Sequence, residues 1–409
     1  MNQQLPTVDV DFTEQPSIPA AGIARANELM TSGRLFRYGE AGAEELDVAE
    51  LEREFAASVG RAYCVATNSC GASLAVALRA VGVAAGDDVL MNAFTLAPVP
   101  GAVAHVQAKA VFVEIDADFR IDIDSLREAQ ATTGAKWLLL SYMRGHIPDM
   151  DQLASVCADL GITIIEDCAH TMGATWNGKA TGTFGAVGCF STQTFKHINS
   201  GEGGLLVTDD PDIAAQAVLL SGSYMLYGQH GAIPGPEVFE RHRFTTPNWS
   251  MRMSALAAAV VRPQLPLLAE RAATWRSHYA RIEAGLEGHR NIRLPVRPAE
   301  EGFVPSSFQF SLVGLRPDEI QQWLDMTAAH GVFVKWFGRP EPVGFTSRFD
   351  HWRYASEQTL LQTQEVLGGL CDIRLPLGLT ADDCADIAAV ITGSLDLVAP
   401  DGVSSAATQ

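Results

Sequence analysis

The chain has 409 residues, too many for one ordinary hydrophobic core, and its length predicts two or three domains. Its composition, 47% hydrophobic and 19% charged, is typical of a folded globular protein, and its formal net charge of −19 argues against a nucleic-acid partner. We expect no membrane span, because the apolar runs are far shorter than the ~20 residues that cross a bilayer. Seven scattered cysteines and a polar start without a secretory signal pattern predict a cytoplasmic protein.

From about residue 60 to 210, short apolar runs alternate with amphipathic stretches. This order predicts an α/β fold whose mostly parallel sheet is covered by helices on both faces. The expected strands are Tyr63–Ala66, Asp88–Met91, Ala110–Glu114, Trp137–Ser141, Ile162–Asp167, Ala186–Ser191 and Gly204–Thr208. The expected helices between them include Ser73–Val81, Asp149–Leu160 and Asp212–Leu220. In such sheets, ligands bind beyond the carboxyl ends of the strands.

The pattern changes after residue 220. Residues 221–250 show no periodicity and predict a long loop, of the kind that serves as a lid, a binding loop or an interface. A long helix is expected from Ser254 to about Glu287, broken near Pro263 and Pro266, and then an α+β unit with strands Ser307–Val313 and Gly331–Lys335. The predicted organisation is an N-terminal arm (1–20), a large domain (21–265), a small C-terminal α+β domain (266–397) and a tail (398–409), frayed beyond Pro400.

Lys196 belongs to the segment Phe190–His197, just past an expected strand end and before Gly201-Glu202-Gly203-Gly204. That position places its amine at the ligand edge of the sheet, where a desolvated lysine can form an imine with a carbonyl compound. A solvated surface lysine is the other interpretation, and this segment alone favours it.

Asp167 ends the apolar run that begins at Ile164. A buried carboxylate at a strand end is costly unless it meets a cation, and a protonated pyridine nitrogen is such a cation. Capping of the next helix explains the residue equally well.

The segment Thr67–Ser73 lies between a strand and a helix and is rich in small and hydroxylated residues. Backbone N–H groups and the helix dipole make such a segment an anion site, to which Ser191 could add a hydroxyl. A simple capped turn is the favoured interpretation of this segment alone. No Gly-x-Gly-x-x-Gly dinucleotide fingerprint opens the fold.

Together, the three segments have the order and spacing of a fold-type I pyridoxal 5′-phosphate (PLP) enzyme. From about Gly39 to Leu375-Pro376-Leu377, the chain resembles the DegT/DnrJ/EryC1/StrS family, whose best-known members are sugar aminotransferases. Further matching stretches are Gly86-Asp87-Asp88-Val89, Asp149-Met150-Asp151, Gly173-Ala174-Thr175 and Gly201-Glu202-Gly203-Gly204.

The resemblance implies that Lys196 holds PLP and carries the proton during amino transfer, while Asp167 pairs with the pyridine nitrogen. It places His170 beside the cofactor ring. It also implies a homodimer with shared active sites, in which loop 221–250 reaches into the partner subunit. The phosphate positions implied by the resemblance are Ser69, Cys70, Gly71 and Ser191.

The chain also departs from the family pattern. Leu96 stands where the family usually has an aromatic residue that stacks on the ring, and Ser141-Tyr142-Met143-Arg144-Gly145 replaces a Val-His-Leu-Tyr-Gly stretch. Ser250 takes the place of an Asn that reaches the partner's phosphate, unless Asn248 substitutes for it. These departures put a nucleotide-sugar substrate in doubt. A different substrate pocket is predicted from Tyr142, Arg144, Lys335 and Trp336, closed by Tyr227; neutral change at packing positions explains these residues equally well.

The predicted function is PLP-dependent transfer of an amino group from glutamate or glutamine to a ketone or aldehyde of a sugar-like or other biosynthetic compound. A PLP-dependent lyase, dehydratase or carbon–carbon bond-forming enzyme is the alternative, although the related sugar 3-dehydratases carry His in place of the lysine. A PLP-binding regulator without turnover is the least favoured reading. We expect no metal, because the His and Cys residues lack ligand spacing.

Overall fold

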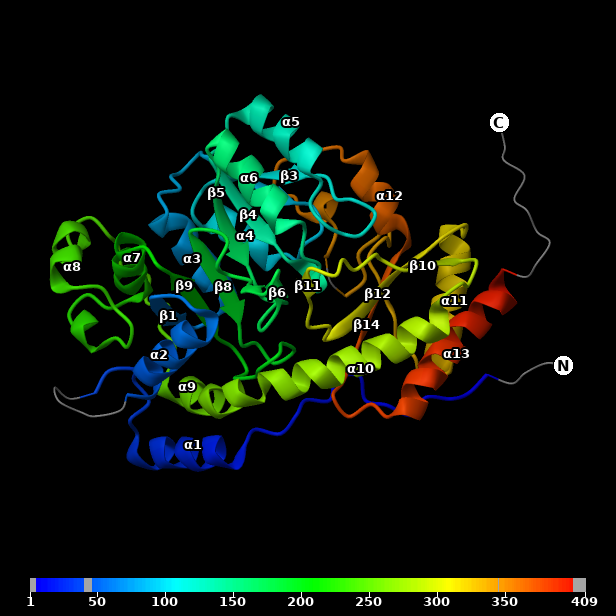
Figure 1. The fold of residues 1–409 in the computed structure, drawn as a ribbon, viewed down its shortest axis with the longest axis horizontal. Coiled ribbons are helices and arrows are strands. Elements are labelled where there is room, and N and C mark those ends of the chain that lie inside the picture. Colours follow the sequence, from blue (N-terminus) through cyan, green and yellow to red (C-terminus); the bar gives the residue numbers. More distant parts are fainter. Residues whose placement is uncertain (1–4, 40–45, 345, 400–409) are drawn as a thin grey trace.

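The computed structural model describes residues 5–39, 46–344 and 346–399. A seven-stranded sheet with helices on both faces occupies one part of the fold, and a four-stranded antiparallel sheet with its own helices occupies the other (Figure 1). The frayed tail expected beyond Pro400 lies outside the described residues. The predicted fold class is confirmed.

The seven-stranded sheet has the order β1-β9-β8-β5-β4-β2-β3. Its strands β2, β3, β4, β5 and β8 pair in parallel, whereas β9 runs antiparallel to both β1 and β8. All seven strands lie where the sequence predicts them. Their bounds are β1 Tyr63–Thr67, β2 Asp88–Asn92, β3 Lys109–Val113, β4 Trp137–Ser141, β5 Thr163–Asp167, β8 Val187–Ser191 and β9 Gly204–Thr208.

Each face of this sheet is buried, which is why its strands are apolar throughout. In β4, Leu138 and Leu140 pack into one core while Leu139 packs into the other, because successive side chains of a strand point to opposite faces. The helices against the first face are α2 Asp47–Val59, α5 Ile123–Thr133 and α6 Met150–Leu160. Those against the second are α3 Cys70–Ala80, α4 Pro98–His105 and α7 Pro211–Ser221.

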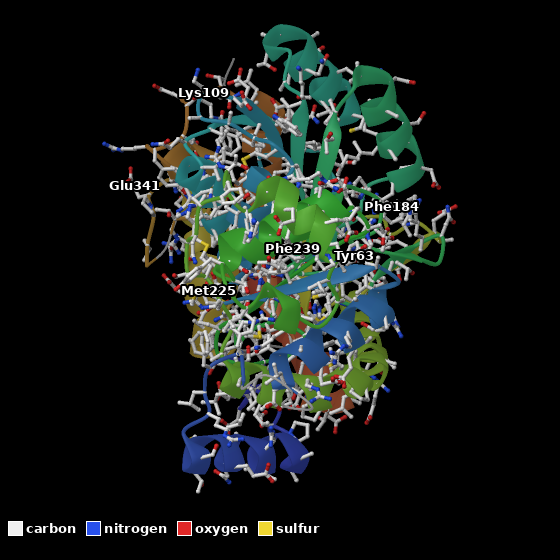
Figure 2. All side chains as sticks on the ribbon, turned by 90° about the vertical axis from the view of Figure 1, so that its left-hand side faces the viewer. Tyr63, Lys109, Phe184, Met225, Phe239 and Glu341 are labelled. Carbon is white, nitrogen blue, oxygen red and sulfur yellow. The ribbon has the colours of Figure 1, made fainter. Side chains whose placement is uncertain are left out.

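Residues 221–250 contain more structure than the predicted loop. The segment includes a 3₁₀ turn, η2 (Tyr227–Gln229), and the helix α8 (Pro236–His242), which packs beside α7 (Figure 1). A helix of two turns is too short to show a hydrophobic period, and its start is marked only by Pro at the first position. Figure 2 turns this side to the viewer and labels Phe239, one of the two buried residues, with Val238, through which α8 joins the core.

The long helix expected from Ser254 is broken where the sequence predicts it. Helix α9 (Ala255–Val261) passes through a 3₁₀ segment, η3 (Arg262–Leu267), that contains both prolines, into α10 (Leu268–Leu286). In Figure 1, α10 runs from α9 to the four-stranded sheet and packs there along α13 (Ala381–Val398).

The four-stranded sheet has the order β10-β12-β14-β13, and every pair in it is antiparallel. The strand expected over Gly331–Lys335 is displaced to Lys335–Trp336, because Gly331, with φ +84°, lies in the turn that follows α11. The bounds are β10 Ile292–Arg293, β12 Ser307–Leu312, β13 Lys335–Trp336, β14 Leu370–Arg374, α11 Pro317–Ala329 and α12 Leu361–Gly369. The division of the chain into domains stays a prediction.

The remaining elements are short or lie outside both sheets. Helix α1 (Ala20–Ser32) packs on α9, and none of the helices in the described part of the chain is both long and apolar enough to span a bilayer. The others are a small sheet of β6 Thr175–Trp176, β7 Lys179–Ala180 and β11 Glu301–Gly302, and the 3₁₀ turns η1 Met143–Gly145 and η4 Phe349–His351.

The glycines that open β9 bring this strand against the start of α3. A side-chain carbon at Gly204 would overlap the Ser69 carbonyl and come within 2.6 Å of Ser73 Oγ. One at Gly203 would overlap the Thr192 hydroxyl. Gly204 is therefore needed for the close approach of two backbones and Gly203 for the close approach of the Thr192 side chain, and together they fix the loop before α3 relative to the end of β8.

We expect Gly204→Ala to lower the free energy of unfolding by roughly 1–3 kcal/mol, the cost of overpacking a close-packed interior. The measurement is urea denaturation of the two proteins. Gly101→Ala in α4 is the control, since no atom lies within 4 Å of the added carbon and alanine favours a helix. Equal stability of the Gly204 variant and the wild type would contradict the packing argument.

Candidate active site

A cavity of about 360 Å³ opens at the carboxyl ends of β4, β5 and β8, beside the N-terminus of α3. The parallel strands deliver their last side chains to this one edge of the sheet. The cavity brings together most of the residues predicted to hold a cofactor. Those among its lining residues are Ser69, Cys70, Gly71, Leu96, Asp167, His170, Ser191 and Lys196.

Asp167 is buried at the end of β5. Ser141 Oγ donates a hydrogen bond to its Oδ2 at 2.7 Å, and the Ala169 N–H donates to Oδ1 at 3.1 Å. Burial raises the pKa of this carboxyl group, while the two hydrogen bonds and the charge of Lys196 oppose the rise. A cation in the cavity would stabilise the charged form of a carboxylate in this position.

Ser141 is a site residue that the sequence argument missed. Its backbone is held by the Asn92 side chain, which accepts from its N–H at 2.9 Å and donates to its carbonyl at 3.0 Å. Thr95 Oγ1 donates to Ser141 Oγ at 2.9 Å, so the serine hydroxyl is oriented to donate to Asp167. The available signal was its place at the end of β4, directly opposite Asp167 in the parallel register.

Lys196 lies across the cavity in the turn after β8. Its Nζ is 2.9 Å from His170 Nε2. Burial first, and then the positive charge of Arg144, lower the pKa of Lys196 to about 8. Burial and the Lys196 charge hold the pKa of His170 well below its usual value, so the imidazole is neutral and accepts from the ammonium group. The pair keeps an amine of unusually low basicity aimed at the cavity.

The first turn of α3 forms the opposite end of the cavity. Ser69 caps this helix, its Oγ accepting from the Ala72 N–H at 3.1 Å. The remaining N–H groups of a first helical turn have no partner within the helix and attract an anion. A side-chain carbon at Gly71 would meet no protein atom closer than 3.9 Å, so glycine leaves room for a ligand here. Ser191, at the end of β8, lines the same cavity.

Tyr142 does not lie in the cavity. It is fully buried in the core on the other face of the sheet, where its hydroxyl donates to Glu166 Oε2 at 2.7 Å. Glu166 also accepts from the N–H groups of Gly182, Phe184 and Gly185, so it fixes that loop. The predicted substrate role of Tyr142 is therefore corrected to a packing role, because the buried carboxylate and the hydroxyl satisfy each other.

Arg144, Lys335 and Trp336 meet in a second pocket, next to the first. Arg144 Nη2 contacts Asp372 Oδ2 of β14 at 2.7 Å, which joins the two sheets at the site. Lys335 and Trp336 form β13, and the Trp336 indole N–H donates to the Gly368 carbonyl at 2.8 Å. The structure thus brings these three predicted residues together.

Ser250, Asn248 and Tyr227 lie away from both pockets of this single chain. Asn248 Oδ1 accepts from the Ser250 N–H at 2.9 Å, and Ser250 is exposed with φ +55°. The Tyr227 ring stacks on Phe239 with centroids 4.4 Å apart. Their predicted roles, in a partner's site or as a closing lid, stay predictions.

Within residues 5–39, 46–344 and 346–399, no group of three or more His, Cys, Asp or Glu side chains could hold a metal ion.

Comparison with known proteins gives one family match over nearly the whole chain. A model described as the DegT/DnrJ/EryC1/StrS aminotransferase family matches residues 17–392. The spore coat polysaccharide biosynthesis protein SpsC of Bacillus subtilis is 32% identical over 62% of this chain and 64% of that protein. The L-glutamine:2-deoxy-scyllo-inosose aminotransferase of Streptomyces fradiae is 32% identical over 68% of this chain and 64% of its own length. The chain therefore spans less than two thirds of either relative.

Among solved structures, that of 3-amino-5-hydroxybenzoic acid synthase superposes with a TM-score of 0.81. The alignment covers 96% of this chain and 100% of that chain at 22% identity, so the likeness concerns the fold.

The pKa of Lys196 predicts how the reaction of this amine with an aldehyde such as PLP would depend on pH, because only the neutral amine attacks an aldehyde. With a pKa of about 8, the neutral fraction rises from about a tenth at pH 7 to about nine tenths at pH 9. The uptake rate of the apoenzyme should rise about tenfold over this range, measured by stopped-flow absorbance.

The positive charge of Arg144 disfavours the ammonium form of Lys196, so removing it should raise the pKa. In Arg144→Met, the midpoint of the uptake profile should therefore move to higher pH, while the exposed-site control Arg127→Met keeps the wild-type midpoint. A midpoint near pH 10.5 in the wild type would refute the proposed desolvation.

Proposed function

Because the chain belongs to the DegT/DnrJ/EryC1/StrS aminotransferase family, we propose that it is an aminotransferase that uses PLP, the cofactor of this family. The amino donor is glutamate or glutamine, and the acceptor is a ketone or aldehyde of a sugar-like or other biosynthetic compound. The observation that carries the proposal is one cavity that holds both the Lys196 amine and the buried Asp167 carboxylate.

The residues of the cavity fit PLP. The buried Asp167 carboxylate suits a protonated pyridine nitrogen, because burial makes an unpaired carboxylate costly. The start of α3 and the Ser191 hydroxyl suit the phosphate, and the absent side chain of Gly71 leaves space for it. Leu96 lines the cavity where it can cover a ring with an apolar side chain.

When bound, PLP supplies an electron sink for the substrate carbon. The residues of this chain supply orientation and proton transfer. Lys196 Nζ, with a pKa of about 8, can both take and return a proton near neutral pH. Neutral His170 Nε2, 2.9 Å away, accepts a hydrogen bond from Nζ and holds it at the cavity wall. Ser141 and the Ala169 N–H favour the ionised form of Asp167 and fix its orientation.

The overall reaction exchanges an amino group and a carbonyl oxygen between the two substrates. The donor becomes a keto acid and is oxidised by two electrons, and the acceptor becomes an amine and is reduced by the same two. No external oxidant or reductant is needed. L-glutamine in the name of the Streptomyces fradiae relative supports an amino-acid donor.

One experiment distinguishes the proposed aminotransferase from the alternative, a PLP-dependent lyase, dehydratase or carbon–carbon bond-forming enzyme. Incubation of the holoenzyme with glutamate or glutamine should convert the cofactor to its amine form, followed by absorbance. If no amino donor produces that change, amino transfer is the wrong reaction. A screen of carbonyl acceptors with mass spectrometry then identifies the aminated product.

Lys196→Ala should abolish covalent attachment of PLP and lower the turnover rate roughly 10²–10⁴-fold, the range for a general acid–base group. Borohydride reduction followed by peptide mass spectrometry should locate the cofactor on Lys196 in the wild type and find none in the variant. Lys109→Ala, at an exposed site (Figure 2), is the control. Full turnover by Lys196→Ala would show that another residue carries out the proton transfer.

We further propose a cytoplasmic homodimer whose active sites are shared, with Asn248 or Ser250 of one subunit reaching the cofactor of the other. Their position outside this chain's own cavity supports a role in a second copy. The seven cysteines without disulfides support a reducing compartment.

Hybrid dimers test the shared site. Lys196→Ala and the double variant Asn248→Ala/Ser250→Ala should each be weakly active, whereas a mixture refolded or co-expressed together should recover activity. In the mixed dimer, one site combines the intact lysine of one subunit with the intact polar pair of the other. Full activity of the double variant alone, or no recovery in the mixture, would overturn the shared site; sedimentation measures the dimer.

A further inference from the structure

A second, larger pocket of about 590 Å³ lies beside the cofactor cavity. Its walls come from the N-terminal arm through Phe12 and Thr13, from β13, from β14, and from Arg144 in the turn after β4. Residues so distant in sequence meet here because the four-stranded sheet abuts the ligand edge of the large sheet. We call this space the arginine-rich pocket.

The arginine-rich pocket adjoins the reactive amine. A small cavity of about 50 Å³ is lined by Lys196 and also by Phe12, Arg144 and Arg374, which are three of the residues that line the larger pocket. A substrate whose reacting carbon lies at Lys196 can therefore extend past Arg144 and Arg374 into this space.

The charge of this pocket is opposite to that of the chain. Among its described lining residues, four side chains are basic and Asp372 is the single carboxylate, in a chain of formal charge −19. Asp372 is already engaged, since it accepts from Arg144 Nη2 and, at 2.7 Å, from Gln309 Nε2. The basic side chains are Arg144, Lys335, Arg339 and Arg374.

These cations repel one another. Burial and the charge of Arg144 lower the pKa of Lys335 to about 7, and the same two causes lower the pKa of Arg374. Arg144 itself adopts φ +56°, a left-handed conformation that L-residues rarely take. Crowded like charges and a strained backbone both cost free energy, and strain of this kind is retained mainly at functional sites. A bound anion would offset the repulsion.

Four of the other lining residues are apolar aromatic ones. Phe333, Trp336 and Phe337 line the pocket with Phe12. Arg339 lies over the Trp336 ring at 5.7 Å and Lys335 over the Phe337 ring at 4.4 Å, so flat apolar surfaces and positive charges alternate. Such a lining suits a ring that carries an acidic group.

We propose that the arginine-rich pocket binds an acidic group, a carboxylate or a phosphate, carried by the carbonyl acceptor. The acceptor is then an acidic compound whose carbonyl reaches Lys196 while its anion lies among Arg144, Arg374 and Lys335, and not a neutral polyhydroxylated ring. This inference rests on the proposed aminotransferase function. The pocket is assigned to the acceptor because its size is that of a drug-sized ligand, much larger than a five-carbon amino acid.

The test measures the two half-reactions separately on the holoenzyme by stopped-flow absorbance. The amine form of the enzyme is mixed with 4-oxocyclohexanecarboxylate or with its neutral carboxamide, and in a second arm with fructose 6-phosphate or fructose. In at least one arm the acid should react about tenfold faster or more, and the preferred arm tells carboxylate from phosphate. Equal rates within both pairs would overturn the proposal.

Substitutions test whether the residues of the arginine-rich pocket cause the rate difference between acidic and neutral acceptors. Arg374→Met and Lys335→Met should lower the rate with the preferred acid about tenfold, at least threefold more than they change the rate with the neutral partner or the glutamate half-reaction. Arg127→Met is the exposed control. Because Arg144→Met would leave Asp372 buried with Gln309 as its remaining partner, Arg144→Met/Asp372→Asn is the matched variant. Its loss should again be larger for the acid than for the neutral partner, since the higher pKa of Lys196 expected without Arg144 affects both acceptors alike. Loss confined to the donor half-reaction would reassign the pocket to the donor and overturn the inference.

Binding gives a readout that does not depend on turnover. Benzoate or phenyl phosphate, but not benzamide, should bind the holoenzyme with uptake of protons at pH 8. An anion stabilises the protonated form of Lys335, which burial and the charges of Arg144, Arg374 and Lys196 disfavour and which Asp372 favours. His351 also lines the pocket. Calorimetry in buffers of different ionisation enthalpy measures the uptake.

Lys335→Met should lose most of this proton uptake. No binding of either anion, or equal binding of benzamide, would overturn the inference even if glutamate converts the cofactor normally. If instead no amino donor converts the cofactor while the anions bind as expected, the reaction class fails and the anion site stands.

Discussion

The site depends on one costly arrangement, a buried carboxylate and a half-buried amine that line the same cavity. Neither Asp167 nor Lys196 would be stable there as an isolated charge, because burial raises the pKa of the acid and lowers that of the amine. The parallel register that pairs Ser141 with Asp167 supplies a hydrogen-bond donor at the required place. The protein's own groups offset the cost of burying these two side chains only in part. A bound cofactor would supply a cationic nitrogen for Asp167 and a reactive aldehyde for Lys196.

The sequence was sufficient for the sheet and for placing Asp167 and Lys196 at the same cavity. Buried parallel strands are apolar throughout and stand out between amphipathic helices, and their carboxyl ends share one edge, so residues that follow β5 and β8 must lie near each other. The same rule of alternation places the Glu166 side chain on the other face from Asp167. The Tyr142 side chain lies on the same face as Glu166. The sequence prediction missed this because Tyr142 was assigned from its position in the family pattern alone.

Other features could not be read from any local pattern. Helix α8 is too short to show a period, and the displacement of β13 depends on where α11 stops. The arginine-rich pocket joins the N-terminal arm, the turn after β4 and two strands of the second sheet. Arg144, Lys335 and Trp336 were identified as a possible pocket, but Phe12 and Arg374 were not, because only the packing of two sheets brings them to the same place.

Arg144 links the reactivity of the site to its specificity. Its charge helps to lower the pKa of Lys196, its ion pair with Asp372 joins the edges of the two sheets, and it lines the pocket in which we place the acceptor's anion. A return to the tyrosine of the family pattern would remove all three effects at once and would leave Asp372 buried with Gln309 as its remaining partner. A single substitution at 144 is therefore disfavoured, since a buried carboxylate without its cationic partner lowers the stability of the fold whether or not a substrate is bound. A substitution at position 144 therefore requires a second substitution at Asp372 in β14. We interpret the Arg144–Asp372 pair as one unit that serves the binding of the proposed acidic acceptor.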